Sequence, residues 1–177
     1  MQLQRLSYSK DGSTTIDTSP RKLSKDYPEA IQIPMANAQL NTPDKIGIIG
    51  YPAKHSLSPT FQQAAFNERN LHIQYEIWET HPDELESVVR LMRAPNILGA
   101  NVTMPFKETI MPLLDSIHPS AELIGAVNTI VKANGLLIGH NTDGIGFVEA
   151  LADLGFASKE KNILIIGAGG AARSIAF

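Results

Sequence analysis

The sequence predicts an α/β protein with an open, mostly parallel sheet, flanking helices and one antiparallel hairpin. Three observations lead to this prediction. Short apolar runs alternate with amphipathic segments from Lys45 onward, which is typical of strands and helices that alternate in a parallel sheet. The turn Ala133-Asn134-Gly135 joins two apolar runs, which indicates a hairpin. The last apolar run leads through a glycine-rich turn into a helix start, a strand–turn–helix unit.

The first half of the pattern contains three predicted strands. IGIIG at 46–50 is typical of a buried strand, HIQYEIWE at 72–79 alternates like a half-buried one, and ILGANVT at 97–103 is the third. Proline is favoured at the first position of a helix, which predicts a helix over 59–70. Its buried face is expected to carry Phe61, Ala64 and Ala65. A second helix follows from the spacing of Leu85, Val88, Val89 and Met92.

The second half continues the alternation. A helix whose first turn holds Lys107 is predicted from the spacing of Ile110, Leu113, Leu114 and Ile117. The hairpin strands are VNTIV and LLIGHNT. A helix over 143–155 is predicted from Phe147, Val148, Leu151 and Leu154, and NILIIGAGG opens a further strand.

Length and composition bound the domain organisation and the partners. The 177 residues, 43% hydrophobic and 19% charged, suffice for one sizeable core and part of a second domain. We expect an extension, disordered or a linker, at 1–44, an α/β domain at 45–158 and the start of a second domain at 159–177. A net charge of −3 provides no field that attracts nucleic acid or an anionic membrane, so a small-molecule partner is expected.

The chain contains no cysteine, which excludes disulfides, thiolate metal sites and cysteine nucleophiles. It has no run of about 18 apolar residues and no apolar stretch of the signal-peptide kind near its N-terminus. We therefore expect a cytoplasmic protein, and no metal site is predicted.

Polar residues collect after three of the predicted strands. HSLSP follows the first strand, TMPFK follows the third, and NTDG follows the second strand of the hairpin. Ligands of open α/β sheets bind beyond the carboxyl ends of the strands. These residues are therefore candidates for a single site.

Each candidate also has an ordinary structural interpretation. Ser58 before Pro59 resembles a helix N-cap and Ser56 a turn residue, although both hydroxyls could receive an anion such as a carboxylate. Thr103 has the properties of a cap. Lys107 is either a solvent-facing side chain or a desolvated lysine that exchanges a proton with a hydroxyl. A lysine in a first helical turn is unfavourable by about 0.3 to 1 kcal/mol, which makes a functional reason plausible.

The segment after the hairpin has the same two interpretations. Asp143 is a helix cap or the carboxylate of a proton-transfer pair with Lys107. Asn128 opens an apolar strand, where a buried amide paired with backbone is the simpler interpretation. Gly144 and Gly146 cost a helix about 1 kcal/mol each relative to alanine. Close approach of a ligand or of another backbone would explain them.

ILIIGAGGAARS carries the most specific local signal. An apolar strand runs directly into Gly167-x-Gly169-x-x-Ala172, the spacing of dinucleotide-binding turns with alanine in the third position. This turn therefore predicts the start of a Rossmann-type domain. The predicted cofactor-binding residues are Gly167, Ala168, Gly169, Gly170, Ala171 and Ala172. Arg173 is ordinarily a plain helix residue, or it faces a phosphate.

Five motifs in order, GYPAKHSLSP, GANVTMPFK, GAVNTI, GHNTDGIGF and IGAGGAARS, resemble the shikimate dehydrogenase family. The resemblance covers residues 45–177, three quarters of the chain. It implies a substrate-binding α/β domain followed by a Rossmann-type NADP domain, with shikimate in the cleft between them. The implied reaction is the reversible, NADPH-dependent reduction of 3-dehydroshikimate to shikimate in aromatic amino-acid biosynthesis.

The resemblance also implies roles for individual residues. Substrate contacts are implied for Ser56, Ser58, Thr103, Lys107, Asn128 and Asp143. Ser56 and Ser58 resemble the pair that binds the substrate carboxylate. Lys107 and Asp143 resemble the catalytic pair, in which the lysine acts on the proton of the C3 oxygen. The implied cofactor is NADP, with NAD not excluded, and a homodimer stays open.

Two features depart from the family pattern. Gln62 and Gln63 stand where the family often has histidine and asparagine, which leaves an auxiliary polar contact open. The cofactor domain has only the 16 residues from Asn162 to Phe177, whereas a dinucleotide-binding βαβ unit needs about 30. NILIIG is then expected to be disordered, packed on the first domain or paired between chains, and this chain is expected not to turn over.

Three alternative functions share part of this pattern. A quinate-using or dual-substrate relative fits the same motifs, because quinate differs mainly by a hydroxyl near the carboxylate. Folate-pathway methylene dehydrogenases share a related plan and a catalytic lysine, but the Ser-x-Ser and Asn-Thr-Asp-Gly motifs disfavour them. A shikimate-binding module without catalysis has no physical need for the intact turn at 167–172.

Overall fold

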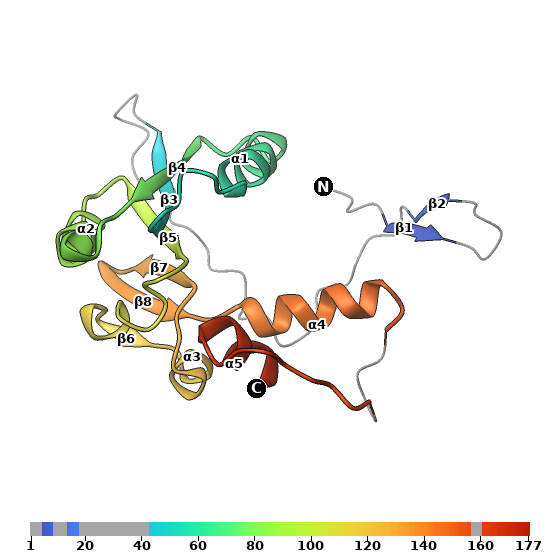
Figure 1. The fold of residues 1–177 in the computed structure, drawn as a ribbon. Helices are drawn as coiled ribbons and strands as arrows, with labels where there is room; N and C mark the ends of the chain where they lie inside the picture. The colour runs from blue at the N-terminus through green and yellow to red at the C-terminus, as the bar shows by residue number, and fades with distance from the viewer. Residues whose placement is uncertain (1–4, 9–13, 18–42, 157–160) are drawn as a thin grey trace.

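The computed structural model describes residues 5–8, 14–17, 43–156 and 161–177. Its centre is a six-stranded sheet with the order β4-β3-β5-β7-β8-β6 (Figure 1). The strands are β3 (Asp44–Gly50), β4 (Ile73–Glu79), β5 (Ile97–Val102), β6 (Ser116–Ile117), β7 (Thr129–Ala133) and β8 (Leu136–His140). β3 runs parallel to β4 and β5, and β6 runs parallel to β8, whereas β7 is antiparallel to both of its neighbours. The predicted α/β fold class is confirmed.

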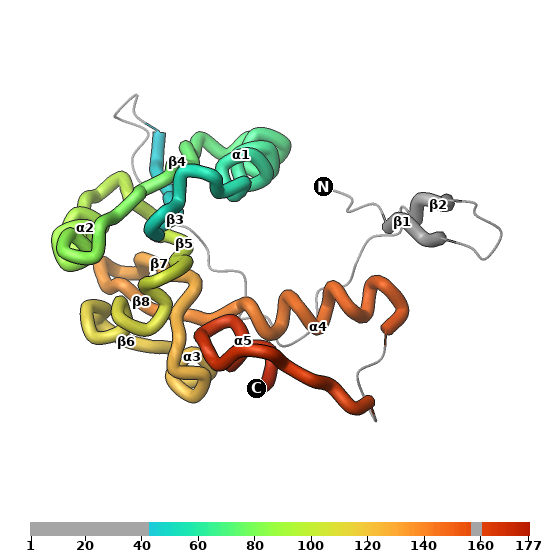
Figure 2. Tube along the Cα trace, viewed as in Figure 1, coloured from blue at the N-terminus to red at the C-terminus, as the bar shows by residue number. Residues whose placement is uncertain are grey.

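Helices lie on both faces of this sheet. They are α1 (Ser58–Glu68), the 3-10 helix η1 (Pro82–Glu84), α2 (Leu85–Leu91), the 3-10 helix η2 (Met111–Leu113), α3 (Pro119–Ile124), α4 (Asp143–Asp153) and α5 (Gly170–Ala176). In Figure 2, α1 and α2 lie on opposite sides of β3 and β4, and α4 extends away from the sheet with α5 beside it. None of the helices in the described ranges is long and apolar enough to cross a bilayer.

The hydrophobic core lies between the sheet and α2. The predicted helical spacing is confirmed, because Leu85, Val89 and Met92 are all buried there. Strand residues such as Ile49 and Val102 meet them from the sheet. This face of the sheet is therefore closed by protein, and ligands must approach from an edge or from the other face.

The predicted buried face of α1 is wrong. Phe61 is 57% exposed and Ala64 is also exposed, whereas the neighbouring Gln63 contacts the sheet. Its amide nitrogen donates to the Ile73 carbonyl at 3.0 Å, and its amide oxygen accepts from the Tyr75 backbone N–H at 2.8 Å. Because β4 is an edge strand, its free backbone groups need such partners. The glutamine that departs from the family pattern thus attaches α1 to the sheet.

The predicted helix around Lys107 is also wrong. Residues 104–110 form turns, followed by η2 and the short β6. Pro105 and Pro112 both lack a backbone N–H, which interrupts a continuous helical ladder. Lys107 therefore carries no first-turn helix cost, and the dipole argument for its function does not apply.

Helix α3 was not predicted, although its sequence carries both end signals. Pro119 occupies the first turn, and the ring nitrogen of His118 accepts from the Ser120 backbone N–H. Gly125 ends the helix with φ of +69°, a left-handed conformation that favours glycine. At six residues, α3 is too short for apolar periodicity to reveal it.

The hairpin is confirmed in detail. β7 and β8 pair through an Asn134-Gly135 turn, whose residues have φ of +52° and +81°. Positive φ at both central positions is the geometry of a two-residue hairpin turn and explains the Asn-Gly sequence. The helix predicted over 143–155 is confirmed as α4.

The ends of the chain are partly described. Within the predicted extension, β1 (Arg5–Tyr8) and β2 (Thr14–Asp17) pair antiparallel, and the rest of that prediction lies outside the described residues. The predicted strand at 162–166 is not paired with any described strand, and Ile166 is 91% exposed.

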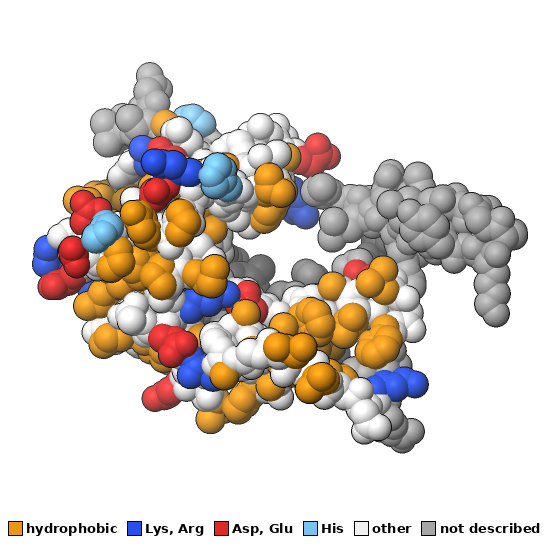
Figure 3. Space-filling view, in the orientation of Figure 1, with side chains coloured by type: hydrophobic (Ala, Val, Ile, Leu, Met, Phe, Trp, Pro, Cys, Tyr) orange, Lys and Arg blue, Asp and Glu red, His pale blue; other side chains and the backbone are white. Residues whose placement is uncertain are grey.

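Exposed apolar residues also line α4, including Phe147 and Val148, where hydrophobic side chains gather in Figure 3.

Candidate functional site

The sheet topology brings the predicted site residues to one edge. β3 and β5 are parallel, and two antiparallel pairings make β8 run in the same direction as β5. The carboxyl ends of these three strands therefore share an edge, at which β7 begins. Ser58, Thr103 and Asp143 follow those ends, and Asn128 immediately precedes β7.

Lys107 and Asp143 form an ion pair at this edge. The ammonium Nζ of Lys107 lies 2.5 Å from the carboxylate Oδ2 of Asp143, and the two side chains are 18% and 28% exposed. The Lys107 carbonyl accepts from the Val127 backbone N–H at 2.7 Å, which fixes the turn that carries the lysine. An amine and a carboxylate in contact, largely shielded from water, are suited to moving a proton.

Asn128 holds the other oxygen of the same carboxylate. Its amide nitrogen donates to Asp143 Oδ1 at 2.7 Å, and its amide oxygen accepts from the Thr142 backbone N–H at 2.9 Å. The side chain therefore connects the start of β7 to the start of α4. The simpler interpretation of Asn128 as a buried amide paired with backbone is met in part, but its strongest contact is with the carboxylate.

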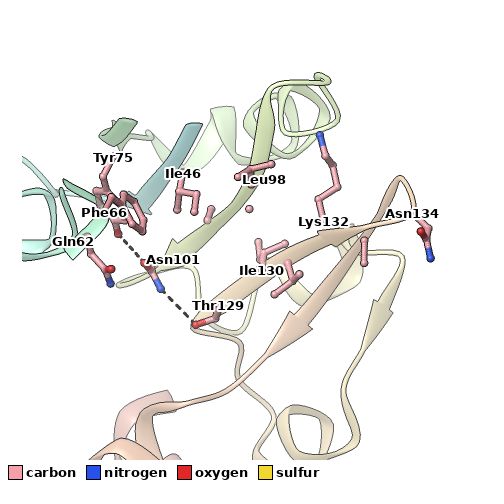
Figure 4. Close-up of a pocket in the computed structure, with 14 residues that line it drawn as sticks. Ile46, Gln62, Phe66, Tyr75, Leu98, Asn101, Thr129, Ile130, Lys132 and Asn134 are labelled. Carbon is pink, nitrogen blue, oxygen red and sulfur yellow. Dashed lines mark hydrogen bonds between the residues drawn. The ribbon is translucent and has the colours of Figure 1, made fainter. Parts of the chain in front are cut away.

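A chain of hydrogen bonds continues from Asn128 across the sheet. Thr129 Oγ1 donates to Asn128 Oδ1 at 3.0 Å and accepts from Asn101 Nδ2 at 3.4 Å. The Tyr75 hydroxyl donates to Asn101 Oδ1 at 2.7 Å, and Figure 4 shows the bonds that Asn101 makes with Tyr75 and Thr129. Tyr75 in turn bonds the side chain of Ser58. One network therefore joins the serine loop, residues 56–58, to the carboxylate of Asp143.

Burial raises the pKa of Tyr75 to about 12, and its hydrogen bond with Ser58 acts in the opposite direction. The hydroxyl stays protonated and available as a donor throughout the physiological range. The folded protein holds the Tyr75 proton more tightly than the unfolded chain does, because the pKa is raised above its unfolded value of 10. The resulting stabilisation of the folded protein is complete below pH 10 and is lost as the pH rises toward 12.

We therefore predict that Tyr75 is the last tyrosine to ionise. Subtracting the alkaline absorbance titration of Tyr75→Phe from that of the parent chain should leave a single step near pH 12. A step near pH 10 would show that the hydroxyl is not buried as described. The other tyrosines serve as the internal reference, since they are present in both proteins.

Ser58 differs from the capping interpretation, whereas Ser56 is the turn residue that the sequence suggests. Leu57, not Ser58, is the N-cap of α1, and no side chain caps that end. Ser56 Oγ accepts from the Ser58 backbone N–H at 3.2 Å, as a turn residue does. The Ser58 hydroxyl is thereby free of capping and bonds Tyr75 instead.

Thr103 contributes through packing and backbone bonds. Its N–H donates to the Ile49 carbonyl, and its carbonyl accepts from the Phe106 N–H. A side chain at Gly50 would lie 2.3 Å from the Thr103 methyl group, so glycine is required there. The structure thus fixes Thr103 between β3 and the lysine turn, and it is these backbone bonds, rather than its hydroxyl, that connect it to the ion pair.

A cavity of about 450 Å³ lies beside this network, on the face of the sheet that carries α1. Gln62, Phe66 and Tyr75 form one end, and Lys132 and Asn134 lie at the other (Figure 4). None of the predicted substrate residues lines it. It touches the candidate site only through Tyr75 and the polar strand residues, so we place the site at the sheet edge because the charged groups converge there.

The predicted cofactor turn leads directly into α5, although the described residues just before it form no strand. Gly167 has φ of +122°, which favours glycine, and Gly169 is the N-cap from which α5 begins. No described atom lies within 4 Å of a Cβ built on either glycine. This open turn fits the close approach of a pyrophosphate. Arg173 does not face that turn: it contacts Glu108 at 2.6 Å and the Gly125 carbonyl at 3.1 Å.

Sequence reasoning missed Tyr75, Asn101 and Thr129. Asn101 had a signal, because it is a lone amide in the apolar strand β5. Tyr75 and Thr129 had none, since a tyrosine or threonine in a strand is ordinary. Their connection depends on the register that pairs Asn101 with Thr129 across β5 and β7.

Comparison with known proteins adds to this geometry. The family model described as "Shikimate dehydrogenase substrate binding domain" matches residues 48–130. A curated shikimate dehydrogenase (NADP(+)) of Alkaliphilus metalliredigens is 48% identical over 132 residues, which are 75% of this chain and 46% of the relative. The chain spans about half the length of the curated relatives it matches.

Two solved structures also align with most of this chain. Shikimate 5-dehydrogenase of Thermus thermophilus, in complex with shikimate, aligns with a TM-score of 0.72 and 39% identity over 75% of this chain and 51% of its own. The ligand-free 5-ketofructose reductase of a Gluconobacter strain aligns with a TM-score of 0.70 and 34% identity, over 77% and 49%.

Proposed function

Because the chain belongs to the shikimate dehydrogenase family, we propose that residues 45–158 form the substrate-binding half of an enzyme that interconverts shikimate and 3-dehydroshikimate with NADP. One observation carries this proposal. Lys107, Asp143 and Asn128 converge at the carboxyl edge of the sheet, joined by bonds of 2.5 and 2.7 Å. A proton-transfer pair at that edge is what oxidation of a bound alcohol requires.

The serine loop supplies the anion-binding end of the proposed site. Ser56 and Ser58 present hydroxyls, and the neutral Tyr75 hydroxyl stands behind Ser58 as a further polar group. A carboxylate accepts hydrogen bonds from such donors without a cationic partner. We place the shikimate carboxylate there, and its ring hydroxyls toward Thr103 and Asn128.

Lys107 handles the proton in the proposed reaction. When shikimate is oxidised, the neutral amine takes the proton from the C3 hydroxyl as the carbon gives up a hydride; in reduction, the ammonium returns it to the carbonyl oxygen. Asp143 orients Nζ, and Asn128 fixes the carboxylate. NADP, when bound, accepts or supplies the hydride.

The turn at 167–172 is the proposed start of the NADP site. Its residues are Gly167, Ala168, Gly169, Gly170, Ala171 and Ala172. The 16 residues from Asn162 to Phe177 are about half of a dinucleotide-binding unit, which needs about 30, so they do not form a complete cofactor site. We therefore expect a protein of these 177 residues to bind the acid without steady turnover. A sustained NADP-dependent oxidation of shikimate by it would contradict this.

The test of the substrate site is a shikimate titration of the isotope-labelled 177-residue chain, followed by amide NMR. Saturable shifts are expected around Ser58, Lys107, Asn128 and Asp143, with Lys45 at the opposite end of β3 as an unaffected reference. Quinate and 5-ketofructose are titrated in parallel, since one aligned structure is a 5-ketofructose reductase. If quinate or 5-ketofructose binds more tightly than shikimate, that compound would be the proposed substrate instead. A folded chain whose site amides do not respond to any of the three would contradict the proposed site.

Association and compartment belong to the same proposal. The unpaired apolar stretch at 163–166 supports pairing with a second copy, as in a homodimer, because exposed strand edges associate. A cytoplasmic location fits the lack of cysteine and a biosynthetic reaction that consumes NADPH.

A further inference from the structure

The helix that follows the predicted cofactor turn contacts the segments that carry both members of the ion pair. α5 lies against α4 and α3, and three of its residues reach the neighbourhood of Lys107 or Asp143. These contacts involve side chains that the proposed chemistry does not use. They raise the question of what α5 does beyond opening a cofactor domain.

The first contact runs from α5 to Asp143 through two buried polar side chains. Ser174 and Asn141 are 2% and 6% exposed. Asn141 Nδ2 donates to Ser174 Oγ at 2.8 Å and to the Ala126 carbonyl at 2.9 Å, while its Oδ1 accepts from the Asp143 backbone N–H at 3.0 Å. The Ser174 hydroxyl donates to the Gly170 carbonyl at 2.6 Å. Both buried side chains are held by hydrogen bonds, so the connection from α5 to Asp143 is rigid.

The second contact reaches the lysine. A Cβ built on Gly170 would lie 3.4 Å from Cβ of Lys107 and 3.5 Å from its Cδ, so the start of α5 packs on the stem of the lysine. Arg173 adds an ion pair with Glu108, the residue after Lys107, at 2.6 Å. The same helix therefore borders the lysine on one side and supports the aspartate on the other.

We propose that Ser174 is a positioning residue for the Lys107–Asp143 pair, which acts through Asn141 and couples α5 to the proton-transfer site. This deepens the proposed function and rests on it. Ser174 touches neither member of the pair. It fixes the amide of Asn141, and that amide fixes the first turn of α4 from which the Asp143 carboxylate projects.

Ordinary helix packing is the competing explanation. If Ser174 only helps α5 pack, its loss should loosen α4 and α5 evenly. If it acts through Asn141, its loss should speed hydrogen exchange at the Asp143 N–H more than at the next α4 amide with a defined partner. The Gly146 N–H, which donates to the Thr142 carbonyl, provides that reference within one turn of the same helix.

The first experiment needs no ligand. Amide hydrogen exchange is measured in the 177-residue chain, in Ser174→Ala and in Ser174→Thr, which keeps the hydroxyl. We expect exchange at Asp143 to be roughly fivefold faster in S174A and near the parent rate in S174T. Exchange at Gly146 should not change. Equal acceleration at both amides, or none at Asp143, would overturn the inference.

The second experiment asks whether Ser174 acts through the aspartate. Shikimate affinity is measured for the parent, S174A, Asp143→Ala and the double variant. We expect S174A to weaken binding roughly fivefold in the parent and to have no further effect without the Asp143 carboxylate. The same factor in both backgrounds would overturn the coupling. If the parent chain does not bind shikimate, the proposed function fails, and the exchange experiment still decides the role of Ser174.

Discussion

Replacing Lys107 by methionine is expected to lower kcat for the NADP-dependent reaction roughly 100- to 10,000-fold, the range of one general acid–base group. Methionine keeps the length and apolar stem of the side chain but cannot carry the proton. The measurement uses the chain joined to the part of a curated relative that it does not match, such as the remainder of the Alkaliphilus metalliredigens shikimate dehydrogenase (NADP(+)), of which this chain matches 46%. KM should change much less, because the proposed carboxylate site at Ser56 and Ser58 is left intact.

Lys45 provides a matched control for this change. Its ammonium lies 2.7 Å from Glu76, and the two side chains are 35% and 25% exposed, so it is a comparable part-buried ion pair. Lys45 lies at the opposite, amino end of β3, away from the proposed site. Lys45→Met should leave kcat within about twofold, with any loss confined to stability. Equal loss of kcat in both variants would reject the proposed role of Lys107.

Gly144→Ala is expected to lower the free energy of unfolding by about 2 to 3 kcal/mol, as overpacking of a closed interface does. A Cβ at this position would lie 2.1 Å from the backbone carbonyl oxygen of Ser174. Backbone cannot rotate away as a side chain can, so α4 and α5 must separate. Urea unfolding followed by circular dichroism measures the change.

Gly146→Ala is the matched control, two residues along the same helix. A Cβ there meets no described atom within 4 Å, and alanine favours a helix over glycine by about 1 kcal/mol. This variant should therefore be as stable as the parent or more stable by up to that amount. Similar destabilisation by both substitutions would show that α5 does not lie against Gly144. The glycine pair of the sequence motif thus has two explanations: close backbone approach accounts for Gly144, and no contact among the described residues accounts for Gly146.

Elements with a strong local pattern could be predicted from the sequence. The apolar spacing of α2, the alternation of β4 and the Asn-Gly turn of the hairpin are all read within a few residues of chain. The helix predicted at Lys107 failed for the opposite reason. Ile110 and Leu113 have helical spacing, but two prolines divide the segment and its apolar residues meet the core from turns.

The candidate site was predictable only as a set of positions. The rule that ligands bind at the carboxyl ends of strands placed Ser58, Lys107 and Asp143 together before any distance was known. It could not reveal the bonds from Tyr75 to Asn101 and on to Thr129, which join residues 26 and 28 positions apart. Those links depend on strand order and register, which are properties of the assembled sheet.

The sequence by itself determined the fold class and the family and proposed residues for the chemistry, because motifs and periodicity are local in the chain. Only the tertiary structure decided how these residues act together. It joined Lys107 to Asp143, turned Gln63 toward the edge of β4 and set Ser174 behind Asn141. The physical reason is that buried polar groups must find partners, and which partners lie within about 3 Å is settled only when strands and helices pack.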